Sequence, residues 1–167
     1  MQLDEINQCS NEDFVAALGA IFEHSPWVAE AVCDKRPFAS CDALQKSMSN
    51  AVNEADVNLQ MALIKAHPDL AGKAALSGEL TEESTSEQAG AGLDRLNADE
   101  YAVFHNLNDT YQSKFGFPFI IAVKGHDKHS IMEAFKTRIE NSADAEKQTA
   151  LEQIYRIAGF RLNDLIS

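Results

Sequence analysis

Apolar side chains recur at every third or fourth position along most of this chain, which is the spacing of helices that turn one face towards a core. The clearest example is the set Phe14, Ala17, Leu18, Ile21 and Phe22. Each such stretch follows a residue type that favours the start of a helix. These predicted starts are Ser10 or Asn11, Ser25 with Pro26 behind it, Ser40, Asp56, Asn97, Ser130 and Ser142. The pattern predicts an all-α bundle of about seven to nine helices.

Two stretches depart from the helical pattern. Residues 69–92 are polar and rich in glycine, so loops and short helical turns are expected there. Residues 117–123 (Phe-Pro-Phe-Ile-Ile-Ala-Val) are almost entirely apolar. A buried strand has this composition, but Pro118 and the lack of any partner strand in the sequence favour one extended buried apolar segment.

The composition bounds the fold and excludes some partners. With 167 residues, 45% of them hydrophobic, and with no repeat or linker, residues 1–167 are predicted to form a single domain. The formal net charge of −12 leaves no cationic surplus for binding nucleic acid or an anionic membrane surface. A small anionic substrate is still compatible, because salt screens a diffuse field within about 8–10 Å while one arginine in a pocket acts locally.

Cysteine usage and targeting patterns point to the cytoplasm. Cys9, Cys33 and Cys41 are an odd number without C-x-x-C spacing, so free thiols in a reducing compartment are expected. The chain shows no signal-peptide pattern at its start, no apolar run of about 20 residues, and no peroxisomal Ser-Lys-Leu ending. We therefore expect a cytoplasmic protein.

His67 stands where the chain turns. Pro68 prevents the preceding helix from continuing, so the imidazole is presented at a helix end. One interpretation is structural, because a histidine in this place interacts well with the last helical carbonyls. The other is catalytic, because a pKa near 6.5 suits proton transfer at neutral pH. Position alone favours the structural interpretation.

The stretch Ser84 to Gln88 also has two interpretations. Ser84-x-x-Glu87 has the spacing of a capping box, in which both side chains satisfy helix N–H groups. The following Gly90 and Gly92 would weaken a helix there, and glycines often mark close approach of the backbone to something else. This favours Ser84, Glu87 and Gln88 as ligand contacts.

Two further features bear on binding. Extended backbone at residues 117–123 must find hydrogen-bond partners, and a planar ligand with amide edges would supply them. Arg161, between Phe160 and Leu162, either extends its charged end to water or holds a carboxylate with two hydrogen bonds. No metal is expected, because His126-Asp127-Lys128-His129 and His67-x-Asp69 lack ligand spacing and a third ligand.

Three motifs together resemble the OHCU decarboxylase family, the 2-oxo-4-hydroxy-4-carboxy-5-ureidoimidazoline decarboxylases of urate degradation. They are Ala66-His67-Pro68-Asp69-Leu70-Ala71-Gly72, Ser84-Thr85-Ser86-Glu87-Gln88-x-Gly90-Ala91-Gly92-Leu93, and Phe115-Gly116-Phe117-Pro118-Phe119-Ile120-Ile121. The similarity extends in order along nearly the whole chain and includes the terminal helix with Arg161 and Leu162. The family's fold is all-helical.

The resemblance implies a carboxy-lyase that needs no cofactor and forms (S)-allantoin in purine breakdown. His67 would transfer the proton, Glu87 would orient or polarise it, and Arg161 would hold an anionic or carbonyl group. The implied substrate contacts are Pro68, Ser84, Gln88 and the backbone of Phe119, Ile120, Ile121, Ala122 and Val123. Gly159 lies two residues before Arg161 and is expected to soften the last helix. Family members are commonly homodimers.

Two other functions are compatible with the sequence. A non-catalytic helical ligand-binding or scaffold module would leave His67, Glu87 and Arg161 far apart or exposed. A related hydrolase acting on a ureide would form product without releasing CO2.

Overall fold

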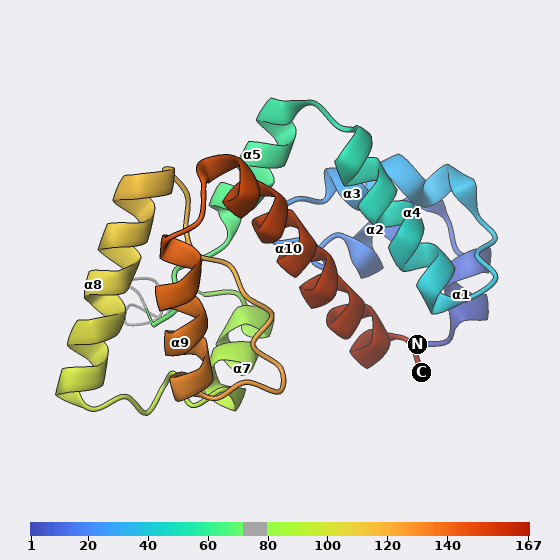
Figure 1. The fold of residues 1–167 in the computed structure, drawn as a ribbon. Coiled ribbons are helices and arrows are strands. Elements are labelled where there is room, and N and C mark those ends of the chain that lie inside the picture. The colour runs from blue at the N-terminus through green and yellow to red at the C-terminus, as the bar shows by residue number, and fades with distance from the viewer. Residues whose placement is uncertain (72–79) are drawn as a thin grey trace. The chain divides into compact units, whose positions relative to one another are not determined.

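The computed structural model describes residues 1–71 and 80–167. In this part the chain forms nine α-helices and one 3₁₀ helix, and no strand (Figure 1). Their bounds are α1 Leu3–Gln8, α2 Asn11–Leu18, α3 Trp27–Val32, η1 Cys33–Lys35, α4 Cys41–Glu54, α5 Val57–Ala66, α7 Glu82–Gly90, α8 Ala98–Phe115, α9 Lys128–Ile139 and α10 Ala143–Leu165. The predicted all-α class is confirmed. Gly72, the last residue of the first motif, lies outside the described residues.

The described chain divides into two compact units. The first consists of Met1–Ala66 with Ile154–Ser167, and the second of His67–Gln153. Helix α10 contributes residues to both units. A single domain over residues 1–167 stays a prediction, and each unit is described by itself below.

Four predicted helix starts are confirmed by their cap hydrogen bonds. In each case the side chain accepts from the backbone N–H three residues further on, at 2.8 to 3.2 Å. These caps are Ser10, Ser40, Asn97 and Ser142. Such a bond satisfies one of the four N–H groups that have no partner inside the helix.

Two predicted caps are wrong by one to three residues. Pro26, not Ser25, is the N-cap of α3, and the Ser25 hydroxyl donates to the Glu23 carbonyl at 2.8 Å. Asp127, not Ser130, caps α9, and its carboxylate accepts from the backbone N–H of Ser130 at 2.8 Å. A carboxylate is the stronger acceptor at the positive end of a helix, so the acidic residue takes the cap.

Helix α7 corrects the expectation of loops and short turns within residues 69–92. Thr81 is its N-cap, with Oγ1 accepting from the Ser84 N–H at 3.2 Å. Ser84 is therefore inside the helix, and the Ser84–Glu87 capping box is wrong. At the other end, Gly92 has φ +80° and Leu93 N–H donates to the Gln88 carbonyl at 3.0 Å. This pattern is the Schellman motif, so the glycines end the helix instead of interrupting it.

The second unit has an aromatic core where α8 and α9 pack together. The two helices lie side by side (Figure 1). The Phe119 ring stacks on Phe135 with centroids 3.9 Å apart, and the Tyr111 ring meets both edge-on. The predicted extended segment is confirmed, because residues 117–123 have no regular secondary structure and are all buried.

In the first unit, Gly159 marks a close contact and does not soften α10, which runs unbroken from Ala143 to Leu165. A Cβ added at Gly159 would lie 2.5 Å from Nε2 of Gln45. That nitrogen donates to the Tyr155 carbonyl at 2.9 Å. All three cysteines are free thiols, as expected. Among the described helices, none has the length and apolar character needed to cross a membrane.

We predict that the effect of Gly159→Ala on stability depends on Gln45. Alanine favours a helix by about 1 kcal/mol over glycine, but here the new methyl displaces Gln45 and breaks a hydrogen bond of about the same size. In a Gln45→Ala background the methyl meets no such obstacle, and Gly159→Ala should raise the free energy of unfolding by about 1 kcal/mol. Urea denaturation of the four proteins measures the coupling; equal effects in both backgrounds would contradict the contact.

Candidate active site

His67 follows directly after α5 and is 8% exposed. The backbone beyond it is held by side-chain amides from two helices. Asn108 on α8 donates through Nδ2 to the Leu70 carbonyl at 2.8 Å. Gln88 on α7 accepts at Oε1 from the Ala71 N–H at 2.9 Å and donates through Nε2 to the Asp69 carbonyl at 3.3 Å. The loop that carries His67 is thus held in place by polar bonds.

Ala71 in this loop has an unfavourable backbone conformation that the surrounding contacts must stabilise. Its φ is +52°, in the left-handed region that disfavours a residue with a Cβ by about 1–2 kcal/mol. Its side chain is nevertheless buried, and its N–H is bound to Gln88. Strain of this kind persists only where surrounding contacts determine the backbone.

Helix α7 places the predicted contact residues on one face. Ser84, Glu87 and Gln88 are spaced i, i+3 and i+4, which brings their side chains together on the helix surface. Ser84 and Gln88 are buried, and Glu87 is half-buried. A Cβ added at Gly90 would have open space around it in the described chain, so a close approach of the backbone to a ligand there stays a prediction.

The extended segment is fixed by side chains instead of a partner strand. The Ile120 carbonyl accepts from Nη1 of Arg138 at 2.6 Å, and the Ala122 N–H donates to Oε1 of Gln153 at 2.9 Å. Within the described residues, no hydrogen bond uses the N–H of Ile121 or of Val123. In both figures the chain between α8 and α9 passes alongside α7.

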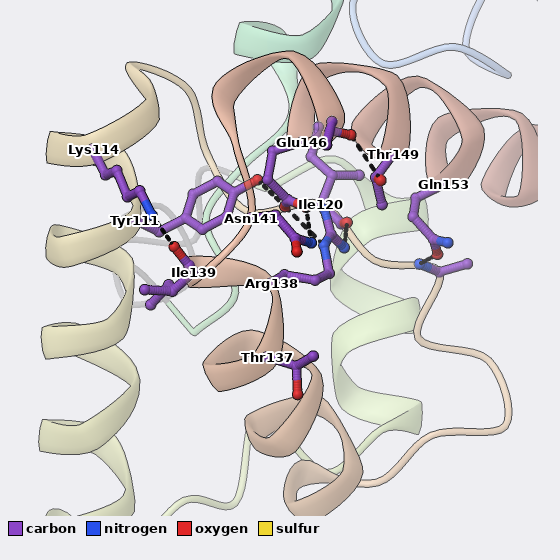
Figure 2. A network of polar contacts seen from close by, with 12 residues as sticks. Tyr111, Lys114, Ile120, Thr137, Arg138, Ile139, Asn141, Glu146, Thr149 and Gln153 are labelled. Carbon is purple, nitrogen blue, oxygen red and sulfur yellow. Dashed lines mark hydrogen bonds and ion pairs between the residues drawn. The ribbon is translucent and has the colours of Figure 1, made fainter.

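A buried polar network contacts this segment at the Ile120 carbonyl (Figure 2). Glu146 is fully buried and accepts from Nε of Arg138 at 2.9 Å and from the Tyr111 hydroxyl at 2.6 Å. The Asn141 amide donates to its other oxygen at 3.0 Å. Burial, followed by the hydrogen bond to Glu146, raises the pKa of Tyr111 above its usual range. The Arg138 guanidinium also lies 4.3 Å from the centroid of the Phe119 ring.

Sequence reasoning missed these supporting residues. Arg138 and Glu146 lie on different helices, and nothing in a periodic pattern distinguishes an inward charge from a solvent-exposed one. Asn108 carried a signal, because an amide occupies a core-facing position of α8 between Phe104 and Tyr111.

Arg161 lies in the first unit and is already engaged there. Its Nη2 is 2.8 Å from Oε2 of Glu23, which is 2% exposed, and its Nη1 donates to the carbonyls of Ala20 and Ile21 at 3.4 and 3.3 Å. The side chain does not extend to water, since Arg161 is 7% exposed. The guanidinium holds a carboxylate of its own chain.

The two histidines of the rejected metal cluster, His126 and His129, take local roles at the start of α9. His126 Nδ1 is 3.0 Å from the Ser130 hydroxyl, and the His129 N–H donates to Asp127 at the cap of α9. Among the described residues, no group of three metal-ligating side chains is found.

Comparison with known proteins decides the family. A family model described as OHCU decarboxylase matches residues 7–163. The chain belongs to the OHCU decarboxylase family. The match covers His67, the α7 face, the extended segment and Arg161 together.

Two members of the OHCU decarboxylase family are similar along nearly their whole length. The 2-oxo-4-hydroxy-4-carboxy-5-ureidoimidazoline decarboxylase of Halalkalicoccus jeotgali is 46% identical over 165 residues, which are 99% of this chain and 92% of that protein. The enzyme of the same name from Haloferax volcanii is 41% identical over 167 residues, 100% of this chain and 97% of that protein. The crystal structure of an (S)-allantoin synthase superposes with a TM-score of 0.81 at 28% identity, over 99% of this chain and 54% of that chain.

We predict that Asp69→Asn stabilises the protein at neutral pH. Burial raises the pKa of the Asp69 carboxyl, Asp109 raises it further, and His105 partly opposes both. The folded state therefore binds a proton more tightly than the unfolded state, and wild-type stability falls as the pH rises above the usual 3.8. The Asn variant has no carboxyl to ionise, so its stability does not fall in this way as the pH rises. It keeps the backbone carbonyl at position 69 that Gln88 binds. Thermal unfolding between pH 3 and 8 should show a difference that grows with pH; a constant difference would contradict the assignment.

We also predict that Arg138→Met lowers the free energy of unfolding by about 3–5 kcal/mol, because it leaves the Glu146 carboxylate buried without its cation. Arg156→Met on α10 is the matched control, since Arg156 is exposed and its loss should cost less than about 0.5 kcal/mol. Adding Glu146→Gln to Arg138→Met should recover part of the loss, because the uncompensated charge is removed. Equal effects of the two arginine variants in urea denaturation would refute a structural role for the network.

Proposed function

We propose that this protein catalyses the cofactor-free decarboxylation of 2-oxo-4-hydroxy-4-carboxy-5-ureidoimidazoline to (S)-allantoin in urate degradation. The observation that carries the proposal is the family match over residues 7–163, supported by relatives with that name over nearly their full length. Family membership favours an enzyme over a non-catalytic helical module.

The chemistry needs no external electron acceptor. The carbon–carbon bond to the carboxylate breaks, CO2 leaves, and the electron pair enters the C=N group of the substrate's own ring. A proton then adds at the carbon that bears the ureido group, a carbonyl forms where the hydroxyl stood, and the proton lost from the hydroxyl is balanced by one gained at the ring nitrogen. One proton is taken up for each CO2 released, so the protein's tasks are to hold the ring and to deliver that proton from one face.

His67 is the proposed proton-transfer residue, acting near the 4-hydroxyl and the departing carboxylate. Its position in a buried, strained and firmly bonded loop supports a role that depends on fixed geometry. Glu87, which is half-buried on α7, orients or polarises the imidazole and the substrate hydroxyl. Pro68 forms a wall beside the histidine.

Recognition of the ring is assigned to α7 and to the extended segment. Ser84 and Gln88 bind the ring and ureido group, and Gln88 Nε2 has a second hydrogen beyond the one given to the Asp69 carbonyl. The backbone of Phe119, Ile120, Ile121, Ala122 and Val123 reads the amide edges of the substrate. The N–H groups of Ile121 and Val123, unused among the described residues, support this assignment.

Other parts of the proposal rest on the family alone. Arg161 holds an anionic or carbonyl group of the substrate, a role that it would add to its ion pair with Glu23. The protein acts on a small molecule and forms a homodimer. A cytoplasmic location is supported instead by its three free thiols, which suit a reducing compartment.

We predict that His67→Asn reduces the formation of optically active allantoin by about 100-fold or more, because general acid–base catalysis supplies that much. Substrate made freshly from urate decays by itself to racemic product, so circular dichroism separates the enzymatic from the spontaneous path. His129→Asn is the control, since His129 is exposed at the start of α9. Racemic product from the wild type would refute the proposed function, and full activity in His67→Asn would remove His67 from the mechanism.

A further inference from the structure

The peptide group between Leu70 and Ala71 is held at both ends by side chains. Its C=O accepts from Nδ2 of Asn108 at 2.8 Å, and its N–H donates to Oε1 of Gln88 at 2.9 Å. The two amides come from different helices, α8 and α7. A peptide group bonded on both sides cannot rotate without breaking one of these bonds. This peptide group directly precedes the Ala71 φ torsion, which has the left-handed value of +52°.

The Asn108 side chain is a poor choice for stability alone. It is 5% exposed, and because the Leu70 carbonyl only accepts, the amide must point its nitrogen there. The Oδ1 atom is then buried without a hydrogen-bond partner in the described part of the chain. An unpaired buried acceptor is destabilising. An apolar side chain of the same shape would remove it but would leave the Leu70 carbonyl unpaired in its place, so the exchange is close to neutral. Leucine has this shape and is a better helix former.

We infer that Asn108 is a positioning residue for the reaction, acting on His67 through the Leu70 carbonyl. This inference rests on the proposed function, in which His67 transfers the proton. His67 lies three residues before Leu70 in the same loop, so rotation of the Leu70–Ala71 peptide changes the path of the backbone that presents the imidazole. Gln88 holds the N–H end of that peptide, and Asn108 alone among the described residues holds its carbonyl.

The test compares Asn108→Leu and Asn108→Asp with the wild type. Both remove the donor to the Leu70 carbonyl. Misplacement of a catalytic group by about 1 Å costs up to about 100-fold in rate, so kcat should fall by about 10-fold or more while KM changes by less than about 2-fold. The melting temperature of Asn108→Leu should stay within about 4 °C of the wild type, because one unpaired acceptor, Oδ1, is exchanged for another, the Leu70 carbonyl. The Asp variant separates loss of the donor from the change in polarity.

Asn7→Leu is the matched control in the first unit. Asn7 holds the backbone of Phe38 in the same way, donating to its carbonyl at 2.9 Å and accepting from its N–H at 2.8 Å. Its loss should lower the melting temperature and leave kcat unchanged. The NMR signals of the His67 ring give a readout that does not depend on activity; they should shift in Asn108→Leu and stay in place in Asn7→Leu.

The outcomes distinguish this inference from the proposed function. A wild-type protein that yields only racemic allantoin overturns the proposed function. An active wild type with unchanged kcat in Asn108→Leu overturns the positioning role alone. A lowered melting temperature with normal kcat and unmoved His67 signals would also overturn it, because Asn108 would then be purely structural.

Discussion

The ion pair between Arg138 and Glu146 is the interaction on which the second unit depends most. An extended apolar segment inside a helical protein has backbone groups that neither a helix nor a sheet satisfies. Arg138 donates a hydrogen bond to one of these groups, the Ile120 carbonyl. The charge of its guanidinium is balanced by Glu146, and the guanidinium also lies over the Phe119 ring. One buried cation thereby joins α9, α10 and the segment between α8 and α9.

The same solution recurs at the His67 loop with neutral groups. Asn108 and Gln88 supply the bonds that regular secondary structure would supply elsewhere, and they hold Ala71 in an unfavourable conformation. Both irregular stretches belong to the proposed site. Irregular backbone has N–H groups that are available to a planar ligand. Hydrogen bonds from side chains on rigid helices fix the positions of those N–H groups before the ligand binds. The polar groups that hold these stretches cost more to bury than apolar ones, and each is bonded to a backbone group or to an opposite charge that offsets this cost.

The sequence predicts the regular parts of the fold well and the irregular parts only in outline. Ser40 and Asn97 are recognised as caps because capping is a local property of a few residues. Helix α7 is missed because Gly90 and Gly92 were expected to disrupt it, whereas a Schellman motif places them at its end. The buried segment 117–123 is predicted from its composition, but its partners Arg138 and Gln153 are distant in sequence and look like ordinary charged and polar helix residues. The family resemblance implies a role for Arg161. The structure pairs Arg161 with Glu23, and no pattern in the sequence indicated that ion pair.

The proposed site depends on one arrangement, in which two fixed backbone stretches, the His67 loop and the segment 119–123, receive the ligand together. Titration of ¹⁵N-labelled protein with (S)-allantoin, followed by NMR, tests it most directly. The amide signals of Ile121 and Val123 and the ring signals of His67 should shift together along one saturable curve. Saturable binding that moves signals elsewhere and leaves both stretches unchanged would contradict it.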